Sequence, residues 1–196
     1  MGLALCYSGG KDSSLAALLL EDFYDVTLVS ATFGLTEDVG HARAAADSLG
    51  FDFESVELDD DVAHEAVDRM AEDGFPRNGI QRVHEHALET VAGEDYDHVA
   101  DGTRRDDRVP SISRAFAQSL EDRHDVDYLA PLQGFGRGAV DDLVERHLEV
   151  ETGPSEDLAK ADYEAELRAL LAEEYGERAV ADVFPAHEQS RVTGRR

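Results

Sequence analysis

Short apolar runs alternate with helix-length amphipathic segments along most of the chain. Residues 3–7 and 26–32 have the length and apolar character of buried strands, and segments 12–21 and 39–49 that follow them show helical periodicity. Such alternation predicts βαβ units with right-handed crossovers, and these build a mostly parallel sheet. We therefore expect an α/β fold with five or six strands and helices on both faces.

The same pattern continues to the C-terminal part of the chain. A length of 196 residues suits one domain, and no repeat or Gly/Ser linker divides it. We expect an α/β domain over 1–152, and a C-terminal helix and tail over 153–196 packed on that domain. Further strands are expected at 53–58, 98–101, 128–131 and 148–151, and further helices at 61–72, 79–91, 111–121 (capped by Ser111), 138–146 and 162–175. Gly50 and Gly74 are expected to end the helices at 39–49 and 61–72.

The chain is strongly acidic and almost free of lysine. It has 44 acidic and 18 basic residues, a net charge of −26, and lysine only at Lys11 and Lys160. This composition resembles that of proteins from extreme halophiles, where ~1 M salt shortens the Debye length to about 3 Å and screens self-repulsion. The acidity therefore argues only weakly against a nucleic-acid partner. The alternative is an acidic surface that repels acidic partners.

Several classes of protein are excluded by simple counts. No apolar run approaches the ~20 residues of a membrane span, and the N-terminus lacks the features of a signal peptide. A single cysteine, Cys6, excludes an intrachain disulfide and a cysteine-only zinc site. Because Cys6 lies inside the first expected strand, we expect it to be a small core residue. A cytoplasmic protein without a membrane partner is expected.

The segment 8–14, Ser-Gly-Gly-Lys-Asp-Ser-Ser, connects the first strand to the first helix. Its glycines allow a tight turn and a close approach of the backbone to a ligand. The free N–H groups and positive dipole end of the helix favour an anion such as phosphate. Asp12 would repel a bare phosphate, but it can hold a Mg²⁺ ion that the phosphates share. The segment lacks the spacing of a Walker A loop.

This segment resembles the pyrophosphate-binding loop of the PP-loop, or N-type, ATP pyrophosphatases of the adenine nucleotide alpha-hydrolase-like superfamily. Its form is most similar to that of the diphthamide synthetase-like and uncharacterised archaeal branch. The resemblance implies a Rossmann-like fold, use of ATP with Mg²⁺, cleavage between the α and β phosphates, and an adenylated intermediate. It assigns the pyrophosphate loop to Ser8, Gly9, Gly10, Asp12, Ser13 and Ser14.

A second charged segment, 100–108, follows the fourth expected strand. Gly102, Arg104 and Asp107 fit the G-x-R-x-x-D pattern that some members of this superfamily carry at the same place. Arginine can neutralise developing phosphate charge, and a pair of aspartates can hold Mg²⁺. We therefore expect Lys11 and Arg104 to neutralise phosphate, and Asp12 and Asp107 to bind the metal. The alternative is a solvated charge run.

Weaker signals follow two other strands. The resemblance places adenine near the end of the second strand, around Thr32, and places Arg137 toward the nucleotide or substrate. An ordinary glycine turn explains the segment before Arg137 equally well.

Lys160 either contacts substrate or is retained by chance. The polar tail 187–192 either closes over the site or is a frayed chain end. His84 and His86 do not have the spacing of a chelating pair and are expected at the surface.

Taken together, these motifs predict an ATP-dependent ligase that adenylates a carbonyl or acyl oxygen for attack by an amine or ammonia. One alternative is an RNA-modifying enzyme of the tRNA lysidine-like or thiolating kind, although no broad basic stripe is visible. The other is a non-catalytic ATP- or AMP-binding module. The acceptor is a small molecule, a protein or tRNA, and a homodimer or a separate nitrogen or sulfur donor protein is a further expected partner.

Overall fold

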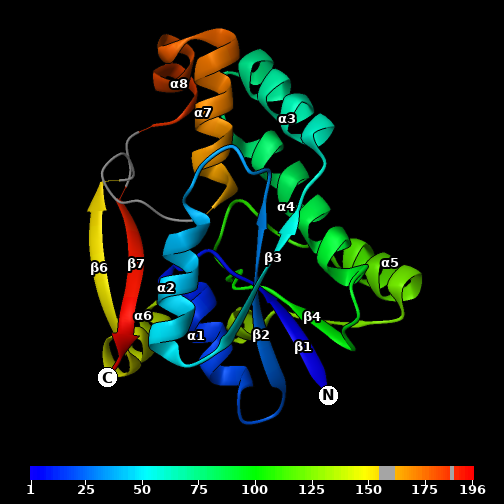
Figure 1. The fold of residues 1–196 in the computed structure, drawn as a ribbon, viewed down its shortest axis with the longest axis vertical. Helices are drawn as coiled ribbons and strands as arrows, with labels where there is room; N and C mark the ends of the chain where they lie inside the picture. Colours follow the sequence, from blue (N-terminus) through cyan, green and yellow to red (C-terminus); the bar gives the residue numbers. More distant parts are fainter. Residues whose placement is uncertain (155–161, 186–187) are drawn as a thin grey trace.

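A five-stranded parallel sheet forms the centre of the molecule, with the strand order β3-β2-β1-β4-β5. The computed structural model describes residues 1–154, 162–185 and 188–196 (Figure 1). The predicted fold class is confirmed, with five strands in the sheet. These strands are β1 (Gly2–Cys6), β2 (Asp25–Thr32), β3 (Asp52–Glu57), β4 (His98–Ala100) and β5 (Asp127–Leu129).

Helices cover both faces because strand residues point alternately to the two sides. Leu3 and Leu5 pack in the cluster that contains Leu15, whereas Ala4 between them packs with Leu88. The first cluster is built on α1 (Lys11–Leu20), α2 (Val39–Leu49) and α6 (Arg137–His147), and the second on α4 (Arg77–Ala92) and α5 (Arg114–His124). Of the helices in the described ranges, none is both long and apolar enough to cross a membrane.

A third hydrophobic cluster lies beyond the carboxyl end of β2. Phe33 joins it there, together with residues of α3 (Asp60–Asp73), α4, α7 (Tyr163–Tyr175) and α8 (Glu177–Val183). Glu166 of α7 is 3% exposed, and its carboxylate accepts hydrogen bonds from Thr32 Oγ1 at 2.7 Å and Leu35 N at 3.0 Å. The C-terminal helices are thereby attached to the loop that follows β2.

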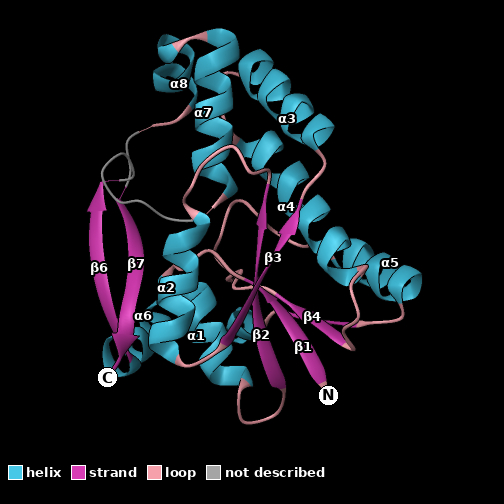
Figure 2. Cartoon of the chain, viewed as in Figure 1, coloured by secondary structure: helices cyan, strands magenta, loops and turns pink. Residues whose placement is uncertain are grey.

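A separate two-stranded antiparallel sheet pairs β6 (Leu148–Pro154) with β7 (Glu188–Arg195). Figure 2 shows this ribbon outside the five-stranded sheet. The strand predicted at 148–151 therefore pairs with the C-terminal tail rather than with the main sheet. The described part of the tail is a strand, and Val192 N donates a hydrogen bond to Gly9 O at 2.9 Å. The C-terminal end of the chain thus supports the glycine-rich loop.

The sequence signals for helix ends are mostly confirmed. Gly50 and Gly74 end α2 and α3 in the left-handed conformation, with φ of 76° and 71°. The predicted cap at Ser111 is wrong, because Ser113 accepts the hydrogen bond from Phe116 N at 3.1 Å. The backbone of Ser111 is instead held to α4 by hydrogen bonds with the Gln81 amide, so the loop continues for two more residues before α5 begins.

Candidate functional site

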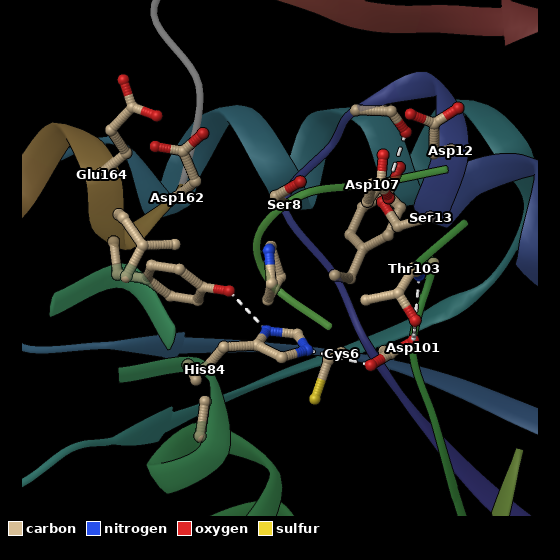
Figure 3. Close-up of a pocket in the computed structure, with 18 of the residues that line it drawn as sticks. Cys6, Ser8, Asp12, Ser13, His84, Asp101, Thr103, Asp107, Asp162 and Glu164 are labelled. Carbon is tan, nitrogen blue, oxygen red and sulfur yellow. Dashed lines mark hydrogen bonds and ion pairs between the residues drawn. The ribbon is translucent and has the colours of Figure 1, made fainter. Parts of the chain in front are cut away.

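The candidate site lies where the strand order reverses, between β1 and β4. After β1 the chain passes to α1 on one face, and after β4 it passes to α5 on the other. Parallel α/β sheets bind ligands outside the carboxyl ends of strands at this kind of switch point. A cavity of about 320 Å³ opens there (Figure 3), lined by both strand-end loops, α4 and the beginning of α7. Its volume is in the range of small-molecule sites, ~300–1,000 Å³.

The glycine-rich loop forms one side of this cavity. Gly9 has a φ of +78°, in the left-handed region that favours glycine, and a Cβ atom there would make only an ordinary 3.4 Å contact with Ala42 Cα of α2. Gly10 caps α1 without a side-chain hydrogen bond. The first-turn N–H groups at the start of α1 therefore have no capping side chain and are available to an anion.

The loop after β4 packs directly on the N-terminus of α1 through Gly102. A Cβ atom on Gly102 would lie 2.7 Å from Ser13 N and 3.0 Å from the Asp12 carbonyl carbon. Real Cβ atoms do not approach backbone atoms so closely, so only glycine fits here without a shift. This contact brings the two sequence motifs, 8–14 and 100–108, into one site.

Charged side chains from both loops meet beside this contact. Arg104 donates to Asp107 Oδ1 from Nε at 3.0 Å and from Nη2 at 2.8 Å, and Arg104 Nη1 lies 3.7 Å from Asp12 Oδ2. Lys11 Nζ lies 3.0 Å from Asp12 Oδ1 and 3.6 Å from Asp141 Oδ1. Burial alone would lower the pKa of Arg104, but the Asp107 and Asp12 carboxylates outweigh it and raise that pKa. The guanidinium therefore stays charged beside the N-terminus of α1.

Asp12 and Asp107 are the side chains here that fit a magnesium ion. Both carboxylates contact Arg104 and line the cavity. Within the described residues, no group of three or more potential ligands is preassembled for a metal. Mg²⁺ bound with a nucleotide needs only one or two carboxylates, since phosphate oxygens and waters complete its coordination. The pair therefore suits an ion that arrives with phosphate.

Some of the residues predicted for the site line the cavity, and others do not. Ser8, Gly10, Lys11, Asp12, Ser13, Gly102 and Asp107 line it. Ser14 is fully buried and its Oγ is 3.0 Å from the Tyr7 hydroxyl, where burial raises the pKa of Tyr7 to about 12. Thr32 is bonded to Glu166, and Arg137 is an exposed first residue of α6. Lys160 and His187 lie outside the described residues.

Sequence reasoning missed a buried polar network in the cavity wall. His84 is 5% exposed, so its predicted surface position is wrong. It lies on the inward face of α4, where Ile80 and Ala87 are spaced four residues before it and three after it. That apolar spacing was the available signal. His86 points elsewhere and is partly buried; its Nε2 accepts a hydrogen bond from Asp59 N at 3.3 Å.

The network connects three parts of the chain. His84 Nε2 lies 2.9 Å from Asp101 Oδ2, and His84 Nδ1 lies 2.5 Å from the Tyr163 hydroxyl. Asp101 is 1% exposed and also accepts hydrogen bonds from Thr103 N, Thr103 Oγ1 and the Tyr128 hydroxyl. Burial alone would raise the pKa of Asp101, but the His84 and Thr103 contacts outweigh it and lower that pKa. A buried carboxylate is thus kept ionised at the base of the cavity.

Cys6 also lines the cavity, next to the His84 ring in Figure 3. Burial, together with the nearby Asp101 carboxylate, raises the pKa of its thiol far above the ordinary value. A thiolate is the reactive form of cysteine, so this environment suppresses reactivity. Cys6 therefore has the electrostatics of a structural residue rather than of a sulfur nucleophile.

Comparison with known proteins identifies relatives along the full chain. A family of unknown function (DUF7411) matches residues 1–194. The chain is 40% identical over 195 residues to the uncharacterized protein MJ0690 of Methanocaldococcus jannaschii, which covers 99% of this chain and 96% of that protein. A crystal structure from the same organism, described as a predicted subunit of tRNA methyltransferase, has a TM-score of 0.92 at 38% identity, over 100% of this chain and 98% of that one.

A more distant similarity is found with the U34-tRNA thiolase NcsA of Methanococcus maripaludis, solved with its 4Fe-4S cluster. Its TM-score is 0.47 at 20% identity, over 74% of this chain and 56% of that one. The family match over 1–194 and the 40% identical relative each span nearly the whole chain, and together they establish the family. This protein belongs to the DUF7411 family.

Proposed function

We propose that this protein is an ATP-dependent enzyme that releases pyrophosphate and adenylates a carbonyl oxygen of an RNA acceptor, for attack by an amine or ammonia. The observation that carries the ATP part is the contact of Gly102 with the N-terminus of α1. It puts the free N–H groups of the glycine-rich loop, Arg104 and two carboxylates into one site. The proposal agrees with the resemblance of segment 8–14 to the pyrophosphate loop of PP-loop enzymes.

Each charged residue has a role in this reaction. The loop N–H groups receive the pyrophosphate, and Lys11 and Arg104 neutralise charge that develops on it. Asp12 and Asp107 are the residues that would hold Mg²⁺, which would supply further charge stabilisation to the phosphates. Without nucleotide, the same cations are balanced by Asp12, Asp107 and Asp141. With ATP bound, Lys11 and Arg104 would exchange these ion pairs for contacts with phosphate.

Two observations favour RNA as the acceptor. The 38% identical crystal structure is described as a predicted subunit of tRNA methyltransferase. In addition, a second hollow of about 310 Å³ is lined by Phe75, Arg77 and Arg108, which are exposed. Among the described residues, neither arginine has an ion-pair partner. Phosphate contacts by arginine and stacking of a base on an aromatic ring are the usual means of binding single-stranded nucleic acid.

This hollow adjoins the main cavity. The two segments 75–81 and 108–111 contribute to both. Pro76, Ile80, Val109 and Pro110 line the cavity, and the hollow is lined by Phe75, Arg77, Asn78, Gln81, Arg108 and Ser111. A single strand of RNA bound across Phe75, Arg77 and Arg108 would therefore pass next to the proposed ATP site. The two arginines of the hollow belong to a chain with a net charge of −26, so long-range electrostatic attraction does not by itself account for RNA binding.

The test is product analysis of ATP labelled at the α phosphate, in 2 M KCl with Mg²⁺, with and without total archaeal tRNA. We expect AMP and pyrophosphate, formed faster with tRNA, and lost in Asp12→Asn. Asp182→Asn, a matched change on an α8 carboxylate that is 71% exposed, serves as the control and retains activity. Formation of ADP and phosphate would refute the reaction type. Formation of AMP and pyrophosphate without any effect of tRNA would refute the RNA acceptor.

A further inference from the structure

The network of Asp101, His84 and Tyr163 lines the same cavity, and the ATP cleavage proposed above does not use it. Its members come from the end of β4, from α4 and from the beginning of α7. Burying an aspartate and a histidine is costly unless every polar atom is paired. Here the pairing is complete, and Figure 3 shows the bond between His84 and Asp101 in the wall that lies across the cavity from Asp12 and Asp107.

The hydrogen-bond partners determine where the protons are. Asp101 accepts from Thr103 at Oδ1 and from the Tyr128 hydroxyl at Oδ2, which favours its ionised form. An ionised carboxylate has no proton to donate, so His84 Nε2 must carry the hydrogen of the 2.9 Å contact. In a neutral imidazole the other nitrogen then accepts. With His84 in its neutral form, the Tyr163 hydroxyl donates to His84 Nδ1.

This arrangement leaves the Tyr163 oxygen able to accept a hydrogen bond from a ligand. Tyr163 lines the cavity and is partly exposed, and its proton is directed toward His84. Asp162 and Glu164, on either side of it, also line the cavity, and Figure 3 shows them grouped at the edge of the site. Asp162 accepts a hydrogen bond from Ala165 N, and Glu164 pairs with Arg168 at 2.9 Å, so neither carboxylate is a free charge. A cationic nucleophile such as an ammonium ion must lose a proton before it attacks, and the Tyr163 oxygen is placed at this edge to accept one.

We propose that Tyr163, His84 and Asp101 form a proton relay that deprotonates the nitrogen nucleophile attacking the adenylated acceptor. The Tyr163 oxygen takes a proton from the ammonium ion while the Tyr163 proton passes to His84 Nδ1, and the free amine nitrogen then bonds to the adenylated carbon. The bond between carbon and the AMP oxygen breaks, AMP leaves with the electron pair, and the second proton of the nitrogen passes to solvent water. Asp101 stabilises the resulting imidazolium, which returns its proton to solvent after product release.

In this relay Tyr163 is the catalytic residue, because it contacts the nucleophile. His84 and Asp101 are positioning residues that act through it. The relay rests on the proposed function, because it serves the second step of that reaction. The two steps can be measured separately: pyrophosphate forms in the first, and AMP is released in the second.

The first measurement needs no ligand. Nitrogen NMR of the full chain labelled at histidine, with His84 assigned from His84→Gln, should show a neutral ring protonated at Nε2 at pH 7.5. Tyr163→Phe, which keeps the ring and removes the hydroxyl, should shift the Nδ1 resonance of His84. His64, whose ring pairs with Glu174 at an exposed position, should be unaffected by that substitution. A proton on His84 Nδ1, or no shift in Tyr163→Phe, would overturn the relay.

The second measurement is single-turnover kinetics with labelled ATP, total archaeal tRNA and ammonium chloride. Tyr163→Phe should form pyrophosphate at a rate within about twofold of wild type and release AMP at least ~100-fold more slowly. Hydroxylamine, which is unprotonated at neutral pH, should restore AMP release. The matched controls Tyr175→Phe and His64→Gln alter exposed hydrogen-bonded rings on α7 and α3 and should behave as wild type.

The outcomes separate the two proposals. Equal slowing of pyrophosphate formation and AMP release in Tyr163→Phe, or the absence of rescue by hydroxylamine, would overturn the relay and leave ATP cleavage intact. Absence of pyrophosphate in the wild-type reaction would overturn the proposed function, and the relay with it, before any variant is compared.

Discussion

Replacing Gly102 with alanine tests whether the two motif loops form one site. The new methyl group would lie 2.7 Å from Ser13 N, whereas ordinary van der Waals contact begins at 3.4 Å, so one loop must move by about 0.7 Å. Both neighbours, Ser13 and Asp12, contribute backbone atoms at the start of a helix, and no flexible side chain can move aside. Overpacking of this kind costs about 1–3 kcal/mol of folding free energy.

The same displacement should impair nucleotide binding more than it impairs folding. It moves the first-turn N–H groups of α1 relative to Arg104, and a misplacement of ~1 Å can cost on the order of 100-fold in activity. We expect at least a tenfold loss of ATP affinity in Gly102→Ala, measured by calorimetry with Mg²⁺ in 2 M KCl. The free energy of unfolding, measured in urea, should fall by about 1–3 kcal/mol.

The matched control is Gly40→Ala in α2. A Cβ atom there would meet nothing within 4 Å, and alanine is favoured over glycine in helices by up to about 1 kcal/mol. Gly40→Ala should therefore keep wild-type ATP affinity and equal or exceed the wild-type stability. If Gly102→Ala matched Gly40→Ala in both measurements, the loops would not be in contact, and the argument for a shared phosphate site would fail.

Three further predictions concern other parts of the molecule. Glu166→Ala leaves the buried N–H of Phe33 without its acceptor and should lower the free energy of unfolding by about 1–3 kcal/mol. Glu173→Ala, at an exposed position of the same helix, should change the free energy of unfolding little. Equal effects of the two variants in urea unfolding would contradict this account. The double variant Arg77→Ala/Arg108→Ala should weaken tRNA binding at least tenfold in fluorescence anisotropy without changing ATP affinity. The control Arg178→Ala, which removes a side chain that is 94% exposed on α8, should leave tRNA binding unchanged. Unchanged tRNA binding in the double variant would show that the hollow is not an RNA site. Because burial and Asp101 raise the pKa of the Cys6 thiol, a disulfide reagent at pH 8 should react at least ~100-fold more slowly with the native chain than with the chain unfolded in urea, and equal rates would show an accessible thiolate.

Local signals predicted most of the central fold. The glycines that end α2 and α3 and the apolar strands at 3–7 and 26–32 are recognisable because neighbouring residues produce these features. The glycine-rich loop is a continuous segment between a strand and a helix, so its resemblance to a phosphate-binding loop can be recognised from the sequence alone. The switch point also follows from the alternation once the strand order is known.

Contacts between distant residues could not be predicted from the same patterns. His84 and Tyr163 are 79 residues apart, and Thr32 and Glu166 are 134 residues apart. No local period links a histidine on a helix to the hydroxyl of a tyrosine in another helix. For the same reason, the tail was expected either to close over the site or to fray, and its pairing with β6 was not foreseen.

The sequence by itself therefore determined the parallel α/β architecture and the chemical character of the two strand-end loops, since both depend on residues that are adjacent along the chain. The tertiary structure alone decided which side chains share the cavity. Packing of α4 and α7 buries His84 next to Asp101 and Tyr163, and close contact at Gly102 joins the two loops. Such pairings depend on how whole helices and strands pack. A buried polar group needs a hydrogen-bond partner, and packing decides which residue, however distant in the sequence, lies close enough to be that partner.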